Sequence, residues 1–317
     1  MSTLHQPPEL SVVIPCYNEE EVIGETSNRL INLLKSLESS GIVRSDSKIY
    51  FVDDGSRDST WPIIVELAQK HEAIHGLKLS RNRGHQTALL AGLLNAEGDV
   101  IVSMDADLQD DIRAIEDMLR EYTKGKDIVY GVREARLTDT FFKKYSAEFY
   151  YRLIRAMGVD VVFNHADYRL MSRRAIRALN EYPESNLFLR GVIPTIGFPS
   201  AIVTYARGER FAGESKYPLR KMLALAIDGI TSFTAFPLRI IATVGLLIFI
   251  GSLLMSGWVL GVKIFTDDAI PGWASSVLPI YFLGGVQLLG IGVVGEYIAK
   301  IYAETKRRPR FFIEDSV

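Results

Sequence analysis

Apolar runs alternate with amphipathic segments along the first part of the chain. Five short apolar runs are typical of buried strands, at residues 10–15, 48–53, 77–79, 100–104 and 128–130. Between them, apolar residues at helical spacing predict three helices. They cover residues 23–37, the segment from the turn at 53–56 to about residue 71, and residues 86–96. Strands that alternate with helices predict an α/β fold with a doubly wound, mostly parallel sheet, in which ligands bind beyond the carboxyl ends of the strands.

Polar side chains follow each of these predicted strands. They are Tyr17, Asn18 and Glu19 after the first, Asp53 and Asp54 after the second, residues 81–85 after the third, Asp105 and Asp107 after the fourth, and Arg133 after the fifth. Two carboxylates one residue apart can share a hard cation such as Mg²⁺ or Mn²⁺, although an isolated pair can also be an acidic loop that only solvates a strand end. Five clusters that converge on one edge favour a phosphate-bearing ligand with a metal.

Composition and glycine patterns exclude several other classes of protein. The balance of 36 Lys and Arg against 38 Asp and Glu gives no reason to expect nucleic acid as a partner. Cys16 is the single cysteine, so neither an intrachain disulfide nor a cysteine metal site is expected. The chain lacks the glycine-rich loop of a P-loop NTPase. A Gly-x-Gly-x-x-Gly pattern at residues 290–295 lies inside an apolar run and predicts helix packing, not a dinucleotide site.

Four segments carry a family resemblance when taken in order. They read Val-Ile-Pro-Cys-Tyr-Asn-Glu-Glu (13–20), Val-Asp-Asp-Gly-Ser-Arg-Asp-Ser-Thr (52–60), Arg-Asn-Arg-Gly-His-Gln-Thr-Ala (81–88) and Met-Asp-Ala-Asp-Leu-Gln-Asp (104–110). The set resembles the inverting GT-A glycosyltransferases that use sugar nucleotides. More narrowly, it resembles the bacterial polyprenyl-phosphate glycosyltransferases of the GtrB type, relatives of dolichyl-phosphate mannose synthase. The resemblance covers nearly the whole chain and implies a Rossmann-like GT-A domain.

The resemblance also implies roles for individual residues. The donor nucleotide would be lined by Pro15, Tyr17, Glu19 and Asp53, with Asp54, His85 and Asp105 in the same donor site, while the metal and diphosphate would be surrounded by Asp105, Asp107 and Gln109. Relatives often continue with Gln-Asp-Pro-Pro-Glu where this chain has Gln-Asp-Asp-Ile-Arg at residues 109–113. This departure leaves open where the helix after the metal loop begins.

Acceptor binding is expected from the segments that follow the fifth strand. By resemblance, Arg133 with Lys143 or Lys144 would bind an acceptor phosphate. Asp167 would be a catalytic residue that orients the acceptor, or else a structural carboxylate that pairs with Arg169 or Arg173. Residues 207–218 resemble a mobile loop in which Arg210, Ser215 and Lys216 would engage the donor phosphates, with a solvated linker as the alternative.

Segments after the fifth predicted strand are expected to attach the protein to a membrane. Residues 141–155 form an aromatic, basic and amphipathic pattern that suits either a membrane surface or a core-facing helix, and a second such pattern covers 219–236. The apolar runs at about 238–262 and 277–298 each exceed the ~20 residues that span a bilayer. The predicted organisation is a catalytic domain at 1–210, a loop and juxtamembrane helix at 211–236, two transmembrane helices at 237–302 and a basic tail at 303–317.

Cations flank the outer ends of this hairpin, which predicts that the catalytic domain and both termini are cytoplasmic, at a bacterial inner membrane. Glycine pairs and the family permit a homo-oligomer such as a tetramer. The expected reaction is transfer of a hexosyl group to polyprenyl phosphate, with UDP-glucose as the first choice of donor and GDP-mannose or a UDP-aminosugar behind it. A processive polysaccharide synthase would need a Gln-x-x-Arg-Trp segment, which the chain lacks. A catalytically inactive membrane scaffold is the remaining alternative.

Overall fold

The structure is a computed structural model that describes residues 6–133, 165–184, 189–206 and 272–317, with scattered positions between 238 and 258. The chain divides into two compact units. The first unit contains residues 1–156, 160–217 and 307–317, and the second contains residues 157–159 and 218–306. The predicted amphipathic segments at 141–155 and 219–236 lie outside the described residues, as does much of the first predicted span.

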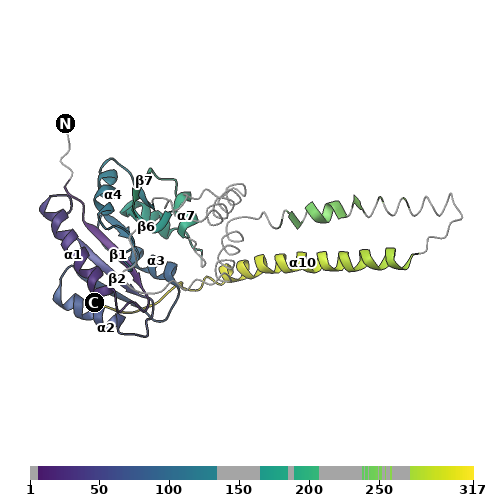
Figure 1. Ribbon diagram of the computed structural model, residues 1–317, viewed down its shortest axis with the longest axis horizontal. Coiled ribbons are helices and arrows are strands. Elements are labelled where there is room, and N and C mark those ends of the chain that lie inside the picture. The colour runs from purple at the N-terminus through teal and green to yellow at the C-terminus, as the bar shows by residue number, and fades with distance from the viewer. Residues whose placement is uncertain are drawn as a thin grey trace. The chain divides into compact units, whose positions relative to one another are not determined.

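Within the described residues, the first unit is built on an eight-stranded sheet in the order β7-β5-β6-β4-β1-β2-β3-β8 (Figure 1). The strands are β1 (Leu10–Cys16), β2 (Lys48–Asp53), β3 (Ile74–Leu79), β4 (Val100–Ser103), β5 (Ile128–Arg133), β6 (His165–Ser172), β7 (Ser200–Tyr205) and β8 (Ile313–Ser316). The helices of this unit are α1 (Ile23–Ser39), α2 (Thr60–Lys70), α3 (His85–Asn95), α4 (Ala114–Thr123), α6 (Arg173–Asn180) and α7 (Leu189–Thr195). Every strand and helix predicted in the first 130 residues is present.

The direction of the strands decides which residues share an edge of the sheet. β1 pairs in parallel with β2 and β4, and β2 pairs in parallel with β3. β6 lies antiparallel between β4 and β5, so β5 runs in the same direction as β4. The mostly parallel α/β sheet is confirmed, but the sequence analysis did not predict β6. Because β6 runs the opposite way, Asp167 near its start lies at the same edge as Arg133 at the end of β5.

Different helices cover the two faces of the sheet. Alternate residues of a strand point to opposite faces. Val12 of β1 belongs to a core cluster that includes buried residues of α1, α2 and α4. Val13 points the other way, towards α3, where a Cβ on Gly92 would overlap the side chains of Val13 and Val52. Glycine at position 92 therefore lets α3 lie close against the sheet. Side chains can reach the carboxyl edge from both faces.

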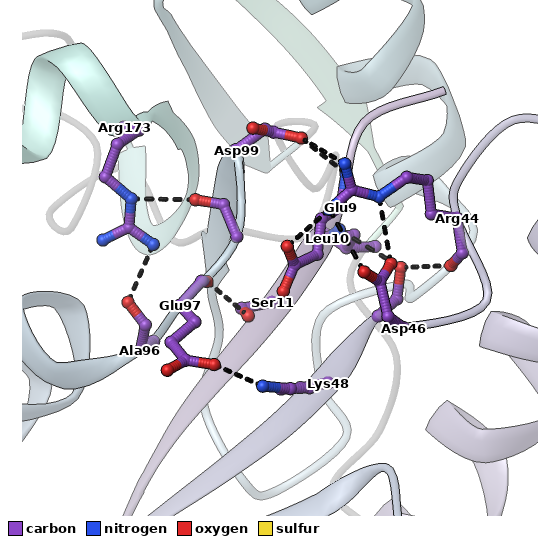
Figure 2. Close-up of polar contacts among 12 residues, drawn as sticks. Glu9, Leu10, Ser11, Arg44, Asp46, Lys48, Ala96, Glu97, Asp99 and Arg173 are labelled. Carbon is purple, nitrogen blue, oxygen red and sulfur yellow. Dashed lines mark hydrogen bonds and ion pairs between the residues drawn. The ribbon is translucent and has the colours of Figure 1, made fainter. Parts of the chain in front are cut away.

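The amino edge of the sheet is closed by ion pairs between its own residues (Figure 2). Arg44 contacts Glu9 at 2.6 Å and Asp46 at 3.0 Å, and Lys48 pairs with Glu97. These side chains are partly exposed, so the pairs contribute little to stability. At this edge the named cations and carboxylates pair with one another. At the carboxyl edge, by contrast, several carboxylates lie close together.

The C-terminal residues return to the sheet as β8, antiparallel to β3. Gly76 and Val317 exchange two backbone hydrogen bonds, at 2.8 and 3.0 Å, and Lys78 contacts Glu314 at 3.1 Å. Upstream of β8, the guanidinium of Arg310 donates to the backbone carbonyls of residues 182 and 184. Residues 313–316 of the segment expected as a basic tail thus form an edge strand of the sheet.

The second unit contains α10 (Trp273–Thr305), which has Pro279 near its start. A Cβ on Gly290 of α10 would lie 3.4 Å from Cγ2 of Ile241, so Ile241 packs against this glycine. The glycine pattern at 290–295 therefore lies within a helix and does not follow a strand, as expected for helix packing. In the described part of the chain, no helix combines the length and the apolar character needed to cross a membrane.

Candidate active site

The first two strand-end loops are joined into one wall of the site. The amide of Asn18 donates to Ser56 Oγ at 2.9 Å, and the amide of Arg57 donates to Asn18 Oδ1 at 2.9 Å. Asn18 has a positive φ of 55°, which asparagine tolerates better than most residues. These loops border a cavity of about 380 Å³. Tyr17 directly follows β1 at the start of the first loop. It has 41% of its surface exposed, so its ring is available to a ligand.

Of the other predicted donor residues on these two loops, Glu19 is partly exposed and Pro15 is buried within β1. The amide of Glu19 donates to Thr60 Oγ1 at 2.9 Å. Asp53 is fully buried, and its carboxylate accepts the amide of Ser56 at 3.1 Å. Burial raises the pKa of Asp53 despite that hydrogen bond. Asp53 thus shapes the turn that carries the wall of the cavity.

Asp54 holds the loop between β3 and α3. Its carboxylate accepts the amides of Arg83 at 2.7 Å and Gly84 at 2.8 Å, immediately before His85. Gly55 has a φ of +69°, and a Cβ there would lie 2.8 Å or less from the backbone of residues 81 and 82. The Asp-Asp-Gly turn therefore fixes the loop that presents His85, so Asp54 shapes the site through the backbone.

The Asp-Ala-Asp loop follows β4 and is anchored from α1. The buried hydroxyl of Thr26 donates to the carbonyl of Ala106 at 2.8 Å. Asp107 Oδ1 accepts the amide of Gln109 at 3.2 Å. Leu108 between them has a φ of 55°, a strained value for a branched side chain. The loop is therefore held in an unusual conformation. The carboxylates of Asp105 and Asp107 and the side-chain amide of Gln109 all belong to this short loop.

The Asp105 carboxylate has the character expected of a cation ligand. Its Oδ1 is buried and accepts no hydrogen bond from the described residues. Burial, together with the nearby Asp110, Asp167 and Asp107, raises its pKa. The described residues contain no group of three His, Cys, Asp or Glu side chains that could hold a metal alone. Mg²⁺ is often bound by one or two carboxylates together with substrate phosphates, so two carboxylates and an amide oxygen fit such an ion.

His85 brings the metal loop and β6 together. Its Nε2 lies 3.4 Å from Asp105 Oδ1 and 3.5 Å from Asp167 Oδ2. Burial lowers the pKa of His85, but hydrogen bonding to Asp167 and the charge of Asp105 outweigh this effect and raise it. Ser103 Oγ also donates to the carbonyl of Asp167 at 2.6 Å, which fixes β6 against β4.

Asp167 is held by two arginines. Arg169 donates to its Oδ1, and Arg190 of α7 donates to both oxygens at 3.2 and 3.1 Å. Burial alone would raise the pKa of Asp167, but the hydrogen bond from His85 and the charges of Arg169 and Arg190 hold it well below its ordinary value. The pairing with Arg169 is one of the two alternatives expected from the sequence. Arg173 instead donates to the carbonyls of residues 96 and 98.

Arg133 lies on the opposite face of the sheet in a second cluster. Its Nη2 and Nε contact Asp110 Oδ1 at 2.9 and 3.2 Å, and Nε also contacts Tyr205 Oη at 3.1 Å. Tyr205 Oη lies 2.5 Å from the same Asp110 oxygen. Burial would lower the pKa of Arg133, but Asp110 and Tyr205 outweigh it and raise the pKa. The predicted acceptor cation is thus held in a buried network.

Two groups of predicted residues cannot be placed. Lys143, Lys144, Arg210, Ser215 and Lys216 all lie outside the described residues. The sequence analysis in turn missed side chains that organise the site: Thr26, Ser103, Asp110, Arg190 and Tyr205. Thr26 carries a detectable signal, because it is a polar residue among the buried positions of α1, which include Ile23 and Leu30. Asp110 ends the motif at residues 104–110 but was given no role, and the other three act through tertiary contacts without a local pattern.

Comparison with known proteins shows the family of this chain. Residues 11–179 match glycosyl transferase family 2. The chain is 49% identical over 313 residues to the uncharacterized glycosyltransferase YkoT of Bacillus subtilis (strain 168), a match that covers 97% of this chain and 91% of that one. It is 39% identical over 309 residues to the prophage bactoprenol glucosyl transferase homolog of Escherichia coli (strain K12), covering 96% and 98%, and 38% identical over 309 residues to the bactoprenol glucosyl transferase of Shigella phage SfII, covering 97% and 98%.

A solved structure has the same fold. It is the glucosyl-3-phosphoglycerate synthase of Mycobacterium tuberculosis, with a TM-score of 0.50 and 18% identity, and the match covers 71% of this chain and 78% of that one. The family match covers more than half of the chain, and the relatives match it nearly end to end. The strand-end motifs and the comparisons lead to the same conclusion, that this chain belongs to glycosyl transferase family 2.

Proposed function

We propose that the protein transfers a hexosyl group from a sugar nucleotide to a polyprenyl phosphate such as undecaprenyl phosphate, with inversion at the anomeric carbon. The observation that carries the proposal is the meeting of His85, Asp105 and Asp167 at the carboxyl edge of a family 2 fold. Near-full-length relatives are named bactoprenol glucosyl transferases, and bactoprenol is a polyprenyl lipid. The product would be a lipid-linked monophosphate sugar.

Glucose from UDP-glucose is the donor that we propose, because the names of these relatives specify a glucosyl group. GDP-mannose and a UDP-aminosugar are the alternatives. The nucleotide would bind along the wall formed by the first two loops, where the exposed ring of Tyr17 can stack on a base. Glu19 borders the same cavity.

A divalent cation, Mg²⁺ or Mn²⁺, would be held by Asp105, Asp107 and Gln109. When bound, such an ion supplies a Lewis acid that stabilises the charge of the departing nucleoside diphosphate. The Oδ1 of Asp105 supports this assignment, because it is buried and accepts no hydrogen bond from the described residues. Thr26 holds the backbone of the loop, so both carboxylates are positioned before the donor arrives.

The acceptor chemistry needs little proton transfer. A phosphate is anionic near neutral pH, so its oxygen can attack without a strong general base, and the larger task is to position two anions. Asp167 suits this division of work, because its two arginines keep it ionised and make it a weak proton acceptor. It would position His85 beside Asp105. Arg133 would bind the acceptor phosphate, together with Lys143 or Lys144.

Membrane attachment is the second part of the proposal. Several large apolar side chains of the second unit are exposed, among them Leu247, Leu254, Ile280 and Ile291, each with more than 60% of its surface accessible. Exposed apolar surface of this kind suits contact with lipid or with another helix. We propose two transmembrane helices in a bacterial inner membrane, with the catalytic unit on the cytoplasmic side. We also propose that the protein is a homo-oligomer such as a tetramer.

The function is tested by incubating membranes that contain the protein with a panel of labelled sugar nucleotides and undecaprenyl phosphate. We expect label from UDP-glucose to enter the lipid fraction, and an anomeric analysis of the product to show inversion. Binding of a sugar nucleotide without any transfer would favour the inactive scaffold instead. Transfer from GDP-mannose or a UDP-aminosugar alone would keep the reaction and replace the donor.

A further inference from the structure

Arg133 is positioned by two side chains that the proposed reaction does not otherwise use. We propose that Asp110 and Tyr205 are positioning residues that fix the guanidinium of Arg133 where it meets the acceptor phosphate. This inference rests on the proposed function, because it takes Arg133 as the contact to that phosphate. Acceptor binding would then depend on two further residues, Asp110 and Tyr205, neither of which is a proposed metal ligand.

One carboxylate oxygen organises the cluster. Asp110 Oδ1 receives Arg133 Nη2 at 2.9 Å, Arg133 Nε at 3.2 Å and the Tyr205 hydroxyl at 2.5 Å. The Asp110 side chain is 1% exposed, whereas that of Arg133 is 23% exposed. The anion therefore lies behind the cation, and the exposed part of the pair belongs to Arg133. A phosphate that approaches this cluster would meet the guanidinium before the carboxylate.

Tyr205 restricts the guanidinium from the side. Its hydroxyl contacts Arg133 Nε at 3.1 Å, and its ring packs edge-on against Tyr168, with centroids 5.2 Å apart at 83°. The Tyr168 hydroxyl in turn donates to the carbonyl of Asp111 at 2.9 Å. Each member is held by a buried neighbour, so Arg133 has a defined orientation before any ligand binds. Such preorganisation lowers the entropy that binding would otherwise cost.

The cluster also connects the two anion sites of the proposed reaction. Asp110 directly follows Gln109, a predicted metal ligand, while Arg133 and Tyr205 are the last residues of β5 and β7. The backbone that carries the metal loop therefore also carries the anchor of the acceptor cation. Through this link, the distance between the donor diphosphate and the acceptor phosphate is set by the fold.

The second carboxylate oxygen of Asp110 has no partner of its own among the described residues, so the carboxylate depends on the contacts that Arg133 and Tyr205 make to the first oxygen. That second oxygen, Oδ2, is buried. A buried carboxylate that loses its partner is costly, whereas an amide in its place no longer holds the cation by charge. Asp110→Asn should therefore release Arg133 without removing the guanidinium itself.

The test is a double-mutant cycle on the full-length protein in detergent or nanodiscs. Asp110→Asn, Arg133→Gln and the double variant are compared for the affinity of a short-chain prenyl phosphate, read from ligand-induced thermal stabilisation, and for KM and kcat in transfer. Tyr205→Phe is a milder change to the same cluster. Asp111→Asn is the matched control, because among the described residues the carboxylate of this exposed neighbour accepts only the amide of Arg113.

We expect Asp110→Asn and Arg133→Gln each to weaken prenyl phosphate binding about tenfold, which corresponds to ~1.4 kcal/mol. The double variant should bind no more weakly than Arg133→Gln alone, since Asp110 acts through Arg133. Stabilisation by the sugar nucleotide with Mn²⁺ should match the wild type in all of them, which also shows that they fold. Tyr205→Phe should give a smaller loss in the same direction, and Asp111→Asn none.

Wild-type acceptor affinity in Asp110→Asn, or losses that multiply in the double variant, would overturn the proposal. A loss of sugar nucleotide binding in Asp110→Asn would overturn it too, since the residue would then support the metal loop instead. If the wild type binds prenyl phosphate but transfers no sugar, the proposed reaction fails while the binding cycle still decides the role of Asp110. If the wild type binds no prenyl phosphate, both proposals fail together.

Discussion

Arg190 and Asp167 form a two-pronged ion pair across the carboxyl edge of the sheet, with Nε and Nη2 of the arginine at 3.2 and 3.1 Å from the two carboxylate oxygens. The pair joins α7 to β6. Because Asp167 Oδ2 is also 3.5 Å from His85 Nε2, the arginine stabilises the carboxylate that faces the histidine. Charge-assisted pairs with this two-bond geometry are among the stronger hydrogen bonds in proteins.

The first prediction concerns this pair. Arg190→Gln and Asp167→Asn should each lower kcat about tenfold, because either change releases His85 from its position beside Asp105. The double variant should lose little more than the worse single variant, as residues in one network are not additive. Steady-state transfer assays measure this. Arg190→Lys keeps the positive charge but cannot make two parallel hydrogen bonds to the carboxylate. Its kcat should lie between that of the wild type and that of Arg190→Gln.

Independent losses that multiply in the double variant would contradict a shared role. A second contradiction would be full activity in Asp167→Asn, since an amide cannot replace a carboxylate held by two arginines. Thermal unfolding of each variant separates these outcomes from simple destabilisation.

A second prediction concerns the metal. Chelation should abolish transfer, and Mg²⁺ or Mn²⁺ should restore it, because two adjacent carboxylates cannot both approach a diphosphate without a cation between them. Asp107→Ala should lower activity at least about a hundredfold, by loss of a ligand to that ion. The measurement is label entering the lipid fraction with and without divalent metal. Metal-independent label, or undiminished label in Asp107→Ala, would remove the metal assignment.

The third prediction tests the turn that places His85. Gly55→Ala should destabilise the protein by about 3 kcal/mol, since it combines a positive φ with overlap against the backbone of the neighbouring loop. Gly41 has a similar φ of +67° and open space around it, so Gly41→Ala should cost only about 1 kcal/mol. Chemical or thermal unfolding gives both values. Equal losses would mean that the close approach of the loop contributes nothing.

Much of the fold could be predicted from the sequence because its elements are local. The runs at β1, β2 and β4 are continuous and apolar, and buried parallel strands have that pattern. β6 was not predicted, since it contains the polar residues Asp167 and Arg169, which are buried by pairing with each other. β8 was missed for a different reason, because its residues are exposed and its strand character comes from pairing with β3.

The candidate site divides in the same way. Carboxylates that follow strands, such as Asp105, can be found from position alone, because parallel strands end at one edge. Arg190 and Tyr205 could not be found, because neither belongs to a local motif. Each lies more than 20 residues along the chain from its partner, and only the fold brings the two together. Tertiary pairing of charged groups leaves no periodic signal in a single sequence.

The fourth prediction is a pH dependence of stability from Asp127. Its carboxylate accepts the Ser172 hydroxyl at 2.7 Å and pairs with Arg174, and the hydrogen bond from Arg174 lowers its pKa in the folded state. A lowered pKa adds stability that is present above the ordinary pKa of an aspartate, ~4, and is lost as the pH falls through the folded value. Asp127→Asn should therefore cost ~1 kcal/mol at pH 7.

The difference between Asp127→Asn and the wild type should shrink as the pH falls below the ordinary pKa of an aspartate, ~4, and through the lowered folded-state pKa, where the wild-type carboxylate takes up a proton. Thermal unfolding over a pH series measures this. Asp117→Asn on the surface of α4 serves as the control, because the Asp117 side chain is 59% exposed. A constant difference at every pH would show that Asp127 acts by shape and not by charge.

The fifth prediction concerns the C-terminal strand. Deletion of residues 313–317 should lower the unfolding temperature by roughly 5 °C or more, because β3 then loses its antiparallel partner and the two hydrogen bonds between Gly76 and Val317. It should also expose a row of unpaired backbone groups on β3, which promotes aggregation. Glu314→Ala is the control, since it removes only the ion pair with Lys78, worth ~0–1 kcal/mol at a partly exposed site. Scanning calorimetry and light scattering of the two proteins decide the matter: a deletion as stable and as soluble as Glu314→Ala would show that the pairing of β8 with β3 contributes nothing to the sheet.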